Sequence, residues 1–194
     1  MTSQHFFFMG GGGVHPIAGV SKKPEIRGRW TNAEPVKMSV EEPLTYNMDL
    51  TDIFNADEEA LESMDLTGFT PDDYNIGAMI TFPDQPLIRH DLLAVLETAG
   101  VDNLQLFEAI VSNPISKRKH HNFSAFNLVG IADFDWARDL RRKISQREFR
   151  VKTPPFLMFY LYDDGPIVVH NSVRLAVEDA NIEGMYFVPT YERF

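Results

Sequence analysis

The chain has 194 residues, of which 44% are hydrophobic and 24% charged, so it can bury a sizeable core without staples. It contains no cysteine, which excludes disulfides, thiolate zinc sites and cysteine nucleophiles and agrees with a reducing compartment. Its formal net charge of -10 argues against nucleic acid or an anionic membrane as the partner, because both require a basic protein surface.

Residues 1–45 show neither helical nor strand periodicity and contain several prolines and the glycine run Gly10–Gly13. We expect an irregular N-terminal arm there, with room for one strand at Phe6–Met9. The glycine run lacks the third glycine of a dinucleotide-binding loop and the lysine of a phosphate loop, so it is interpreted as a flexible turn. Neither a basic leader followed by a long apolar stretch nor about 18 consecutive apolar residues occurs, which predicts a cytoplasmic protein without a membrane partner.

Acidic residues are concentrated between residues 41 and 84. This segment holds twelve Asp or Glu residues and no Lys or Arg, so it carries about the whole net charge. Part of the acidity fits a short helix that Asn55 caps, with Glu58 three residues later and apolar Phe54, Leu61 and Met64 near one face.

Residues 46–194 are expected to form a single domain that mixes helices and strands. Apolar residues from Ile88 to Ala99 recur at helical spacing, between Pro86 and the left-handed stop Gly100. Leu104–Val111 and Phe123–Ile131 have the composition of strands and would form a β-hairpin or meander, joined by a basic connection.

The C-terminal part continues this alternation, and no repeat is apparent in it. The predicted elements are a basic helix at Asp135–Gln146, a strand at Phe156–Tyr162, a turn at Asp163–Pro166, a strand beginning at Ile167–Val169, a helix capped by Asn171, and a short strand at Met185–Val188. Neighbouring strands with interspersed helices favour an α+β fold with a mixed, mainly antiparallel sheet and several packed helices.

Catalytic and cofactor motifs are absent from the sequence, so neither an enzyme nor a cofactor is expected. One alternative stays open: Asp133, Asp135 and His120 or His121 could converge around a metal and form a small hydrolase. The structural interpretation of the same residues is a solvated turn at the two histidines and a helix cap at Asp135.

The acidic segment is the remaining candidate for function. A surface of one sign attracts an oppositely charged partner and speeds association, although the same charge also serves simple solubility. The residues expected to bind a partner are Asp49, Asp52, Asp57, Glu58, Glu59 and Glu62.

Blocks of sequence from about residue 85 to residue 190 resemble a known family in order and spacing. They comprise Ile88–Leu96 with Gly100–Leu106, Phe126–Gly130 followed by Asp133 and Asp135, Phe156–Met158, Ile167–Val169, and the last predicted helix leading to Glu183–Pro189. This pattern resembles the immunity proteins of bacterial polymorphic toxin systems, a large group first catalogued as a domain of unknown function in myxobacteria, vibrios and other proteobacteria.

The resemblance implies a small α+β protein without catalytic residues that protects its producer by binding a cognate toxin domain. Some members of this family accompany nuclease toxins, so a basic, nuclease-type toxin acting in the cytosol is the first partner expected. A regulatory or scaffold module without a toxin is a third interpretation, which gene neighbourhood would separate from the first.

Overall fold

In the part of the chain that the structure describes, two helices combine with two main β-sheets, which confirms the α+β class predicted from the sequence. The computed structural model describes residues 6–11, 17–20, 26–27, 35, 37–38, 43–48, 77–80, 86–112, 118–130, 156–161 and 165–189. A separate two-stranded pair consists of β3 (Ile26–Arg27) and β4 (Lys37–Met38). Neither helix in this part of the chain has the length and apolar character needed to cross a membrane.

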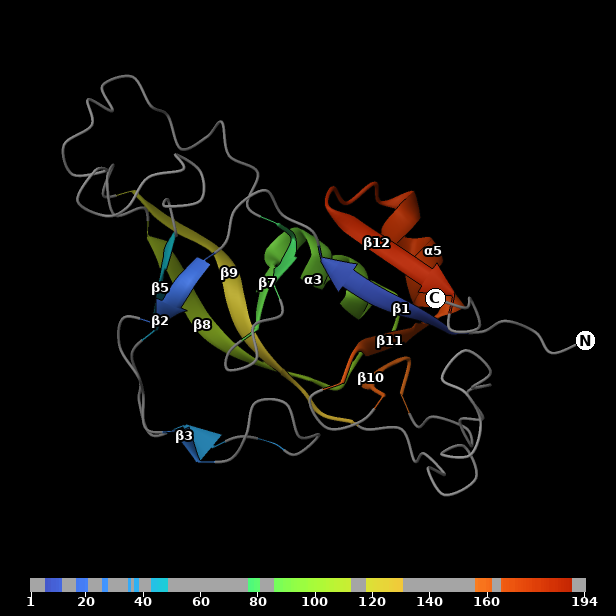
Figure 1. The fold of residues 1–194 in the computed structure, drawn as a ribbon, viewed down its shortest axis with the longest axis horizontal. Coiled ribbons are helices and arrows are strands. Elements are labelled where there is room, and N and C mark those ends of the chain that lie inside the picture. The colour runs from blue at the N-terminus through green and yellow to red at the C-terminus, as the bar shows by residue number, and fades with distance from the viewer. Residues whose placement is uncertain are drawn as a thin grey trace, which may run out of the picture.

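The smaller main sheet has four antiparallel strands, and its strand order places the N-terminus beside the C-terminal region. The order is β10 (Met158–Tyr160), β11 (Ile167–His170), β1 (Phe6–Gly11) and β12 (Met185–Pro189). Figure 1 shows β1, in blue, between strands coloured orange to red. The strand predicted at Phe6–Met9 is therefore confirmed, and it lies inside the sheet.

The larger sheet has six strands and is mixed. Its order is β2 (Ile17–Val20), β5 (Leu44–Met48), β8 (Leu104–Ser112), β9 (Lys119–Leu128), β7 (Leu87–Arg89) and β6 (Met79–Ile80). Strands β5 and β8 are parallel, and every other neighbouring pair is antiparallel. The predicted hairpin of β8 and β9 is confirmed, although β9 begins at Lys119, inside the expected connection.

Two β-α-β units of the same design contain the two described helices. In the first, β7 leads through α3 (His90–Thr98) to the parallel strand β8, and the antiparallel strand β9 lies between them. In the second, β11 leads through α5 (Asn171–Asp179) to β12, with β1 between them. Both helices have nine residues, and α5 and β12 begin 81 positions after α3 and β8, so the structure contains a repeat that the sequence pattern did not reveal.

Both helices end in the same way. The N–H of Gly100 donates to Glu97 and that of Val101 to Leu96, which is the Schellman pattern of hydrogen bonds. In α5 the same two bonds run from Asn181 to Glu178 and from Ile182 to Val177. The left-handed residue is Gly100 with φ 92° in the first unit and Asn181 with φ 52° in the second, so an asparagine takes the place of a glycine.

The main hydrophobic core lies where the two helices meet both sheets. Its fully buried members include Leu92 and Leu96 of α3 and Val173 and Val177 of α5. A smaller cluster on the other face of the four-stranded sheet contains Phe159, Leu161 and Val168, with Phe6 and Phe8 packed against it. The four-stranded sheet is therefore apolar on both faces, which explains its continuous runs of apolar residues.

The side chain of Asn103 helps to join the two sheets. It is 8% exposed, and its Nδ2 donates to the carbonyl of Val129 at 2.8 Å and to that of Met158 at 2.9 Å. The N–H of Tyr160 also donates to the carbonyl of Gly130 at 2.9 Å. These hydrogen bonds tie the end of β9 to β10. They are expected to persist, because a buried N–H group is rarely left without an acceptor.

Several predicted boundaries are wrong for identifiable reasons. Ile88 was predicted to be helical but lies in β7. The prediction failed because Ile88 packs into the same core as the helical residues, so its position in the sequence matches their spacing. The residue that caps α5 is His170, whose Nδ1 accepts from the N–H of Ser172 at 3.2 Å, and Asn171 is the first helical residue. The strand predicted at Phe156–Tyr162 is shorter, since β10 begins at Met158 and ends at Tyr160.

The glycine run is not simply a turn. Gly10 and Gly11 belong to β1, and a side chain at either position would overlap the ring of Tyr186 or the carbonyl of Met79. Glycine is needed there because two other groups approach the backbone closely. Gly12 and Gly13 lie outside the described residues, as do the helices predicted at 55–64 and 135–146.

Candidate functional site

The residues predicted to bind a partner lie outside the part of the chain that the structure describes. This holds for Asp49, Asp52, Asp57, Glu58, Glu59 and Glu62. The structure does describe the strands on either side of them, β5 and β6, so it fixes where this acidic connection starts and ends.

The two anchoring strands are firmly packed and far apart in one sheet. Leu44 and Tyr46 of β5 are each 2% exposed, and Met79 of β6 is 1% exposed. Burial raises the pKa of Tyr46 well above its usual range, so its phenol stays neutral. Strands β8, β9 and β7 lie between β5 and β6, which separates the anchors by about 19 Å at the usual strand spacing. The acidic connection must therefore join two sides of the larger sheet.

The structure describes both histidines of the metal alternative, and one of them, His121, lies in a bulge of β9. Ala109 pairs with Phe123 and Val111 with His120, so one residue of β8 faces two residues of β9, His121 and Asn122. His120 is half-buried and His121 is exposed. Asp133 and Asp135 lie outside the described residues, so the structure does not test whether the predicted set converges. Among the described side chains, no three His, Asp or Glu residues are placed to hold a metal ion.

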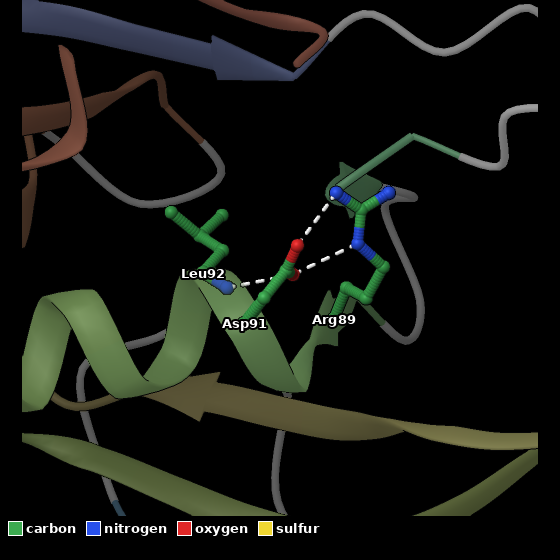
Figure 2. A network of polar contacts seen from close by, with 3 residues as sticks. All are labelled: Arg89, Asp91 and Leu92. Atoms are coloured by element: carbon green, nitrogen blue, oxygen red, sulfur yellow. Dashed lines mark hydrogen bonds and ion pairs between the residues drawn. The ribbon is translucent and has the colours of Figure 1, made fainter. Parts of the chain in front are cut away.

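A network of charged groups marks the start of α3 (Figure 2). The guanidinium of Arg89 donates from Nε and Nη2 to the two carboxylate oxygens of Asp91, both at 2.8 Å. Asp91 Oδ1 also accepts from the N–H of Leu92 at 2.7 Å. The Arg89 hydrogen bonds, assisted by the Leu92 N–H, lower the pKa of Asp91, so the carboxylate remains charged where the helix dipole favours it. This network stabilises the helix start.

Beside this network, His90 and Ser124 approach each other. His90 Nε2 lies 3.1 Å from Ser124 Oγ, and the contact joins α3 to β9. A histidine next to a serine hydroxyl is one half of a nucleophile and base arrangement, which also needs a group that orients the imidazole. The adjacent carboxylate, Asp91, is held by Arg89 and so does not serve His90. The arrangement fits a link between elements better than a catalytic centre.

Apolar side chains also reach the surface, and sequence reasoning did not single them out. Leu106 is 39%, Leu175 44% and Tyr186 55% exposed. Tyr186 lies on β12 and faces Gly10 of β1, with its ring over the glycine backbone. A glycine within an aromatic strand was the signal for this contact, because aromatic side chains often cover glycines on a neighbouring strand. Isolated exposed apolar residues are normal on protein surfaces and do not define a site.

In comparisons with known proteins, no family model and no curated protein matches the chain.

Proposed function

We propose that the protein is an immunity protein that binds and neutralises a cognate toxin acting in the cytosol, by occluding it. A nuclease-type toxin with a basic surface is the favoured partner. The observation that carries the proposal is the segregation of charge along the chain, and the resemblance of residues 85–190 to immunity proteins supports it.

The charge is distributed very unevenly. Twelve of the 28 acidic residues lie between residues 41 and 84, where there is no Lys or Arg. The rest of the chain holds the other 16 acidic residues and all 18 Lys and Arg residues, so its charges nearly balance. Such a concentration attracts a cationic surface over distances of about a Debye length, roughly 8 Å at physiological salt. A nuclease carries a cationic surface because it must bind phosphates, so an acidic inhibitor can cover that surface.

The scaffold at the ends of the acidic segment supports the same function. Leu44 and Tyr46 of β5 and Met79 of the edge strand β6 are buried, and three strands separate β5 from β6 in the six-stranded sheet. These buried residues hold both ends of the acidic connection before a partner binds, which limits the ordering cost of binding.

Co-expression with the product of the neighbouring upstream gene tests the proposal. We expect that gene to stop growth when expressed alone, and growth to recover when the tagged protein is present, with a stoichiometric complex in the pull-down. A toxic neighbour that this protein neither binds nor neutralises would contradict the proposal.

A charge-matched pair of variants tests the role of the acidic segment. Asp57, Glu58, Glu59 and Glu62 are changed to Lys in one variant. In the control, four exposed acidic residues of the folded scaffold, Glu97, Asp102, Glu108 and Asp179, are changed to Lys. Both changes alter the net charge equally, so we expect the first variant to lose about tenfold or more in association rate at low salt and the control to lose less. Equal rates for the two variants would remove the acidic segment from the interface.

A further inference from the structure

The second β-α-β unit takes its central strand from a distant part of the chain. Strand β1 comprises residues 6–11, whereas β11 and β12, the strands on either side of it, begin at residues 167 and 185. The first unit differs, because its central strand β9 follows β8 in a hairpin. The residues from β11 to β12 therefore leave a gap between these two strands, the strand slot, and β1 fills it.

The strand slot holds β1 by pairing along both edges. Phe6–Met9 pair with β11, and Phe7–Gly11 pair with β12. The backbone of β1 is thus bound on both sides in one register. Main-chain pairing of this kind binds an extended segment regardless of which chain supplies it.

Side chains of β1 fill both faces of the slot. Phe7 and Met9 pack into the main core, while Phe6 and Phe8 pack against the smaller cluster on the opposite face. The ring of Phe6 lies edge-on to Phe159 at 5.7 Å between centroids. The slot is therefore specific for a strand with aromatic or apolar residues on both faces, followed by glycines where Tyr186 and Met79 approach the backbone.

The chain leaves the four-stranded sheet after β1. The next strand, β2, belongs to the other main sheet, and the sequence between them continues the glycine run Gly10–Gly13. Exchange of an identical element between copies preserves every contact of the element itself and is a low-cost route to a dimer.

We propose that the strand slot binds residues 6–11 of a second copy of this chain, giving a dimer in which two copies exchange β1. The inference is independent of the toxin, since it depends on the pairing and packing of β1 alone. Monomer and exchanged dimer contain the same contacts, so concentration during folding decides their proportions.

The absence of native cysteine allows a direct test by cross-linking. Phe8 and Val188 are directly opposite each other across β1 and β12. Facing residues on antiparallel strands have Cβ atoms about 4.5 to 5.5 Å apart, close to what a disulfide needs. Full-length chains carrying Phe8→Cys and chains carrying Val188→Cys are unfolded, mixed, refolded over a range of concentrations, oxidised and separated without reductant.

A matched control uses the unit whose central strand is held in a hairpin. Glu108 and Ser124 are directly opposite each other across β8 and β9, and one copy carries Glu108→Cys while the other carries Ser124→Cys. We expect the β1 pair to give several-fold more disulfide-linked dimer than the hairpin pair, with a yield that rises with concentration. Size-exclusion chromatography of the unaltered chain, refolded at high concentration, should show a dimer as well.

A single chain that carries both Phe8→Cys and Val188→Cys should close an internal disulfide at low concentration. Failure to close it would overturn the proposal, because β1 would not occupy the slot in this register. The proposal also fails if the double variant closes but mixed copies never cross-link, or if the hairpin pair cross-links equally well.

Discussion

The two β-α-β units of this protein have the same backbone plan but obtain it from different residues. Both have a nine-residue helix that ends in the same pair of hydrogen bonds. They differ at the helix start, where Arg89 binds Asp91 in one unit and the His170 ring caps the other. They also differ in the central strand, which is local in the first unit and comes from the N-terminus in the second.

The fold needs some features in both units and supplies others in different ways. Apolar residues facing the shared core and a left-handed residue after the helix occur in both units. Caps and connections vary. Substitutions at equivalent positions of the two units should therefore change the free energy of unfolding in the same direction. The size of each change should depend on the side chain that is removed.

The largest effects are expected in the core. Leu96 and Val177 occupy equivalent positions and are 0% and 1% exposed. We expect Leu96→Ala to lower the free energy of unfolding by about 3 kcal/mol and Val177→Ala by about 2 kcal/mol, because leucine loses one more buried carbon. Urea denaturation measures both. A larger loss for Val177→Ala would show that the second unit depends on its helix more than the first.

The residues after the helices should give the next largest effects. Gly100→Ala should lower the free energy of unfolding by about 1 to 2 kcal/mol, since alanine is strained at its φ of 92° while a Cβ there would make ordinary contact with Leu157. Asn181→Gly should change stability by less than about 0.5 kcal/mol, because relief of strain is offset by the entropy of glycine in the unfolded chain. Thermal unfolding of both variants checks this, and a tolerated alanine at residue 100 would contradict the assigned geometry.

The caps predict smaller differences. His170→Ala removes the side-chain acceptor for the Ser172 N–H and should lower the free energy of unfolding by about 1 kcal/mol. His170→Asn is the matched control, since asparagine is among the best capping residues and should restore most of that loss. Equal destabilisation by the two variants would mean that His170 acts through its contact with Phe6 instead.

The smallest expected effect concerns pH. Because Arg89 lowers the pKa of Asp91, the pair stabilises the fold above the usual Asp pKa of about 3.9 and ceases to do so as the pH falls through the lowered value. Asp91→Asn should therefore be slightly less stable than the unaltered protein from about pH 5 to pH 8, and this difference should shrink in acid. The effect is small because the side chain of Asp91 is 48% exposed. A difference that grows in acid would contradict the ion pair.

The sequence predicted elements well where the signal was local. The helix around Leu92 and Leu96, the hairpin of β8 and β9, and the Phe-rich strand β1 all follow from residue type and spacing. It did not predict that β1 joins β11 and β12, because pairing across more than 150 positions leaves no local pattern. The His170 cap was missed since histidine is not a usual capping residue. The acidic candidate site rests on composition, and its side chains lie outside the described residues.

The most direct test of the account is a titration of the toxin's activity with this protein, both purified. If the protein acts by occlusion, activity falls in proportion to the amount added and reaches its minimum at one equivalent. Loss of activity at far less than one equivalent would contradict occlusion and indicate catalysis, and full activity in the presence of excess protein would contradict the proposed partner altogether.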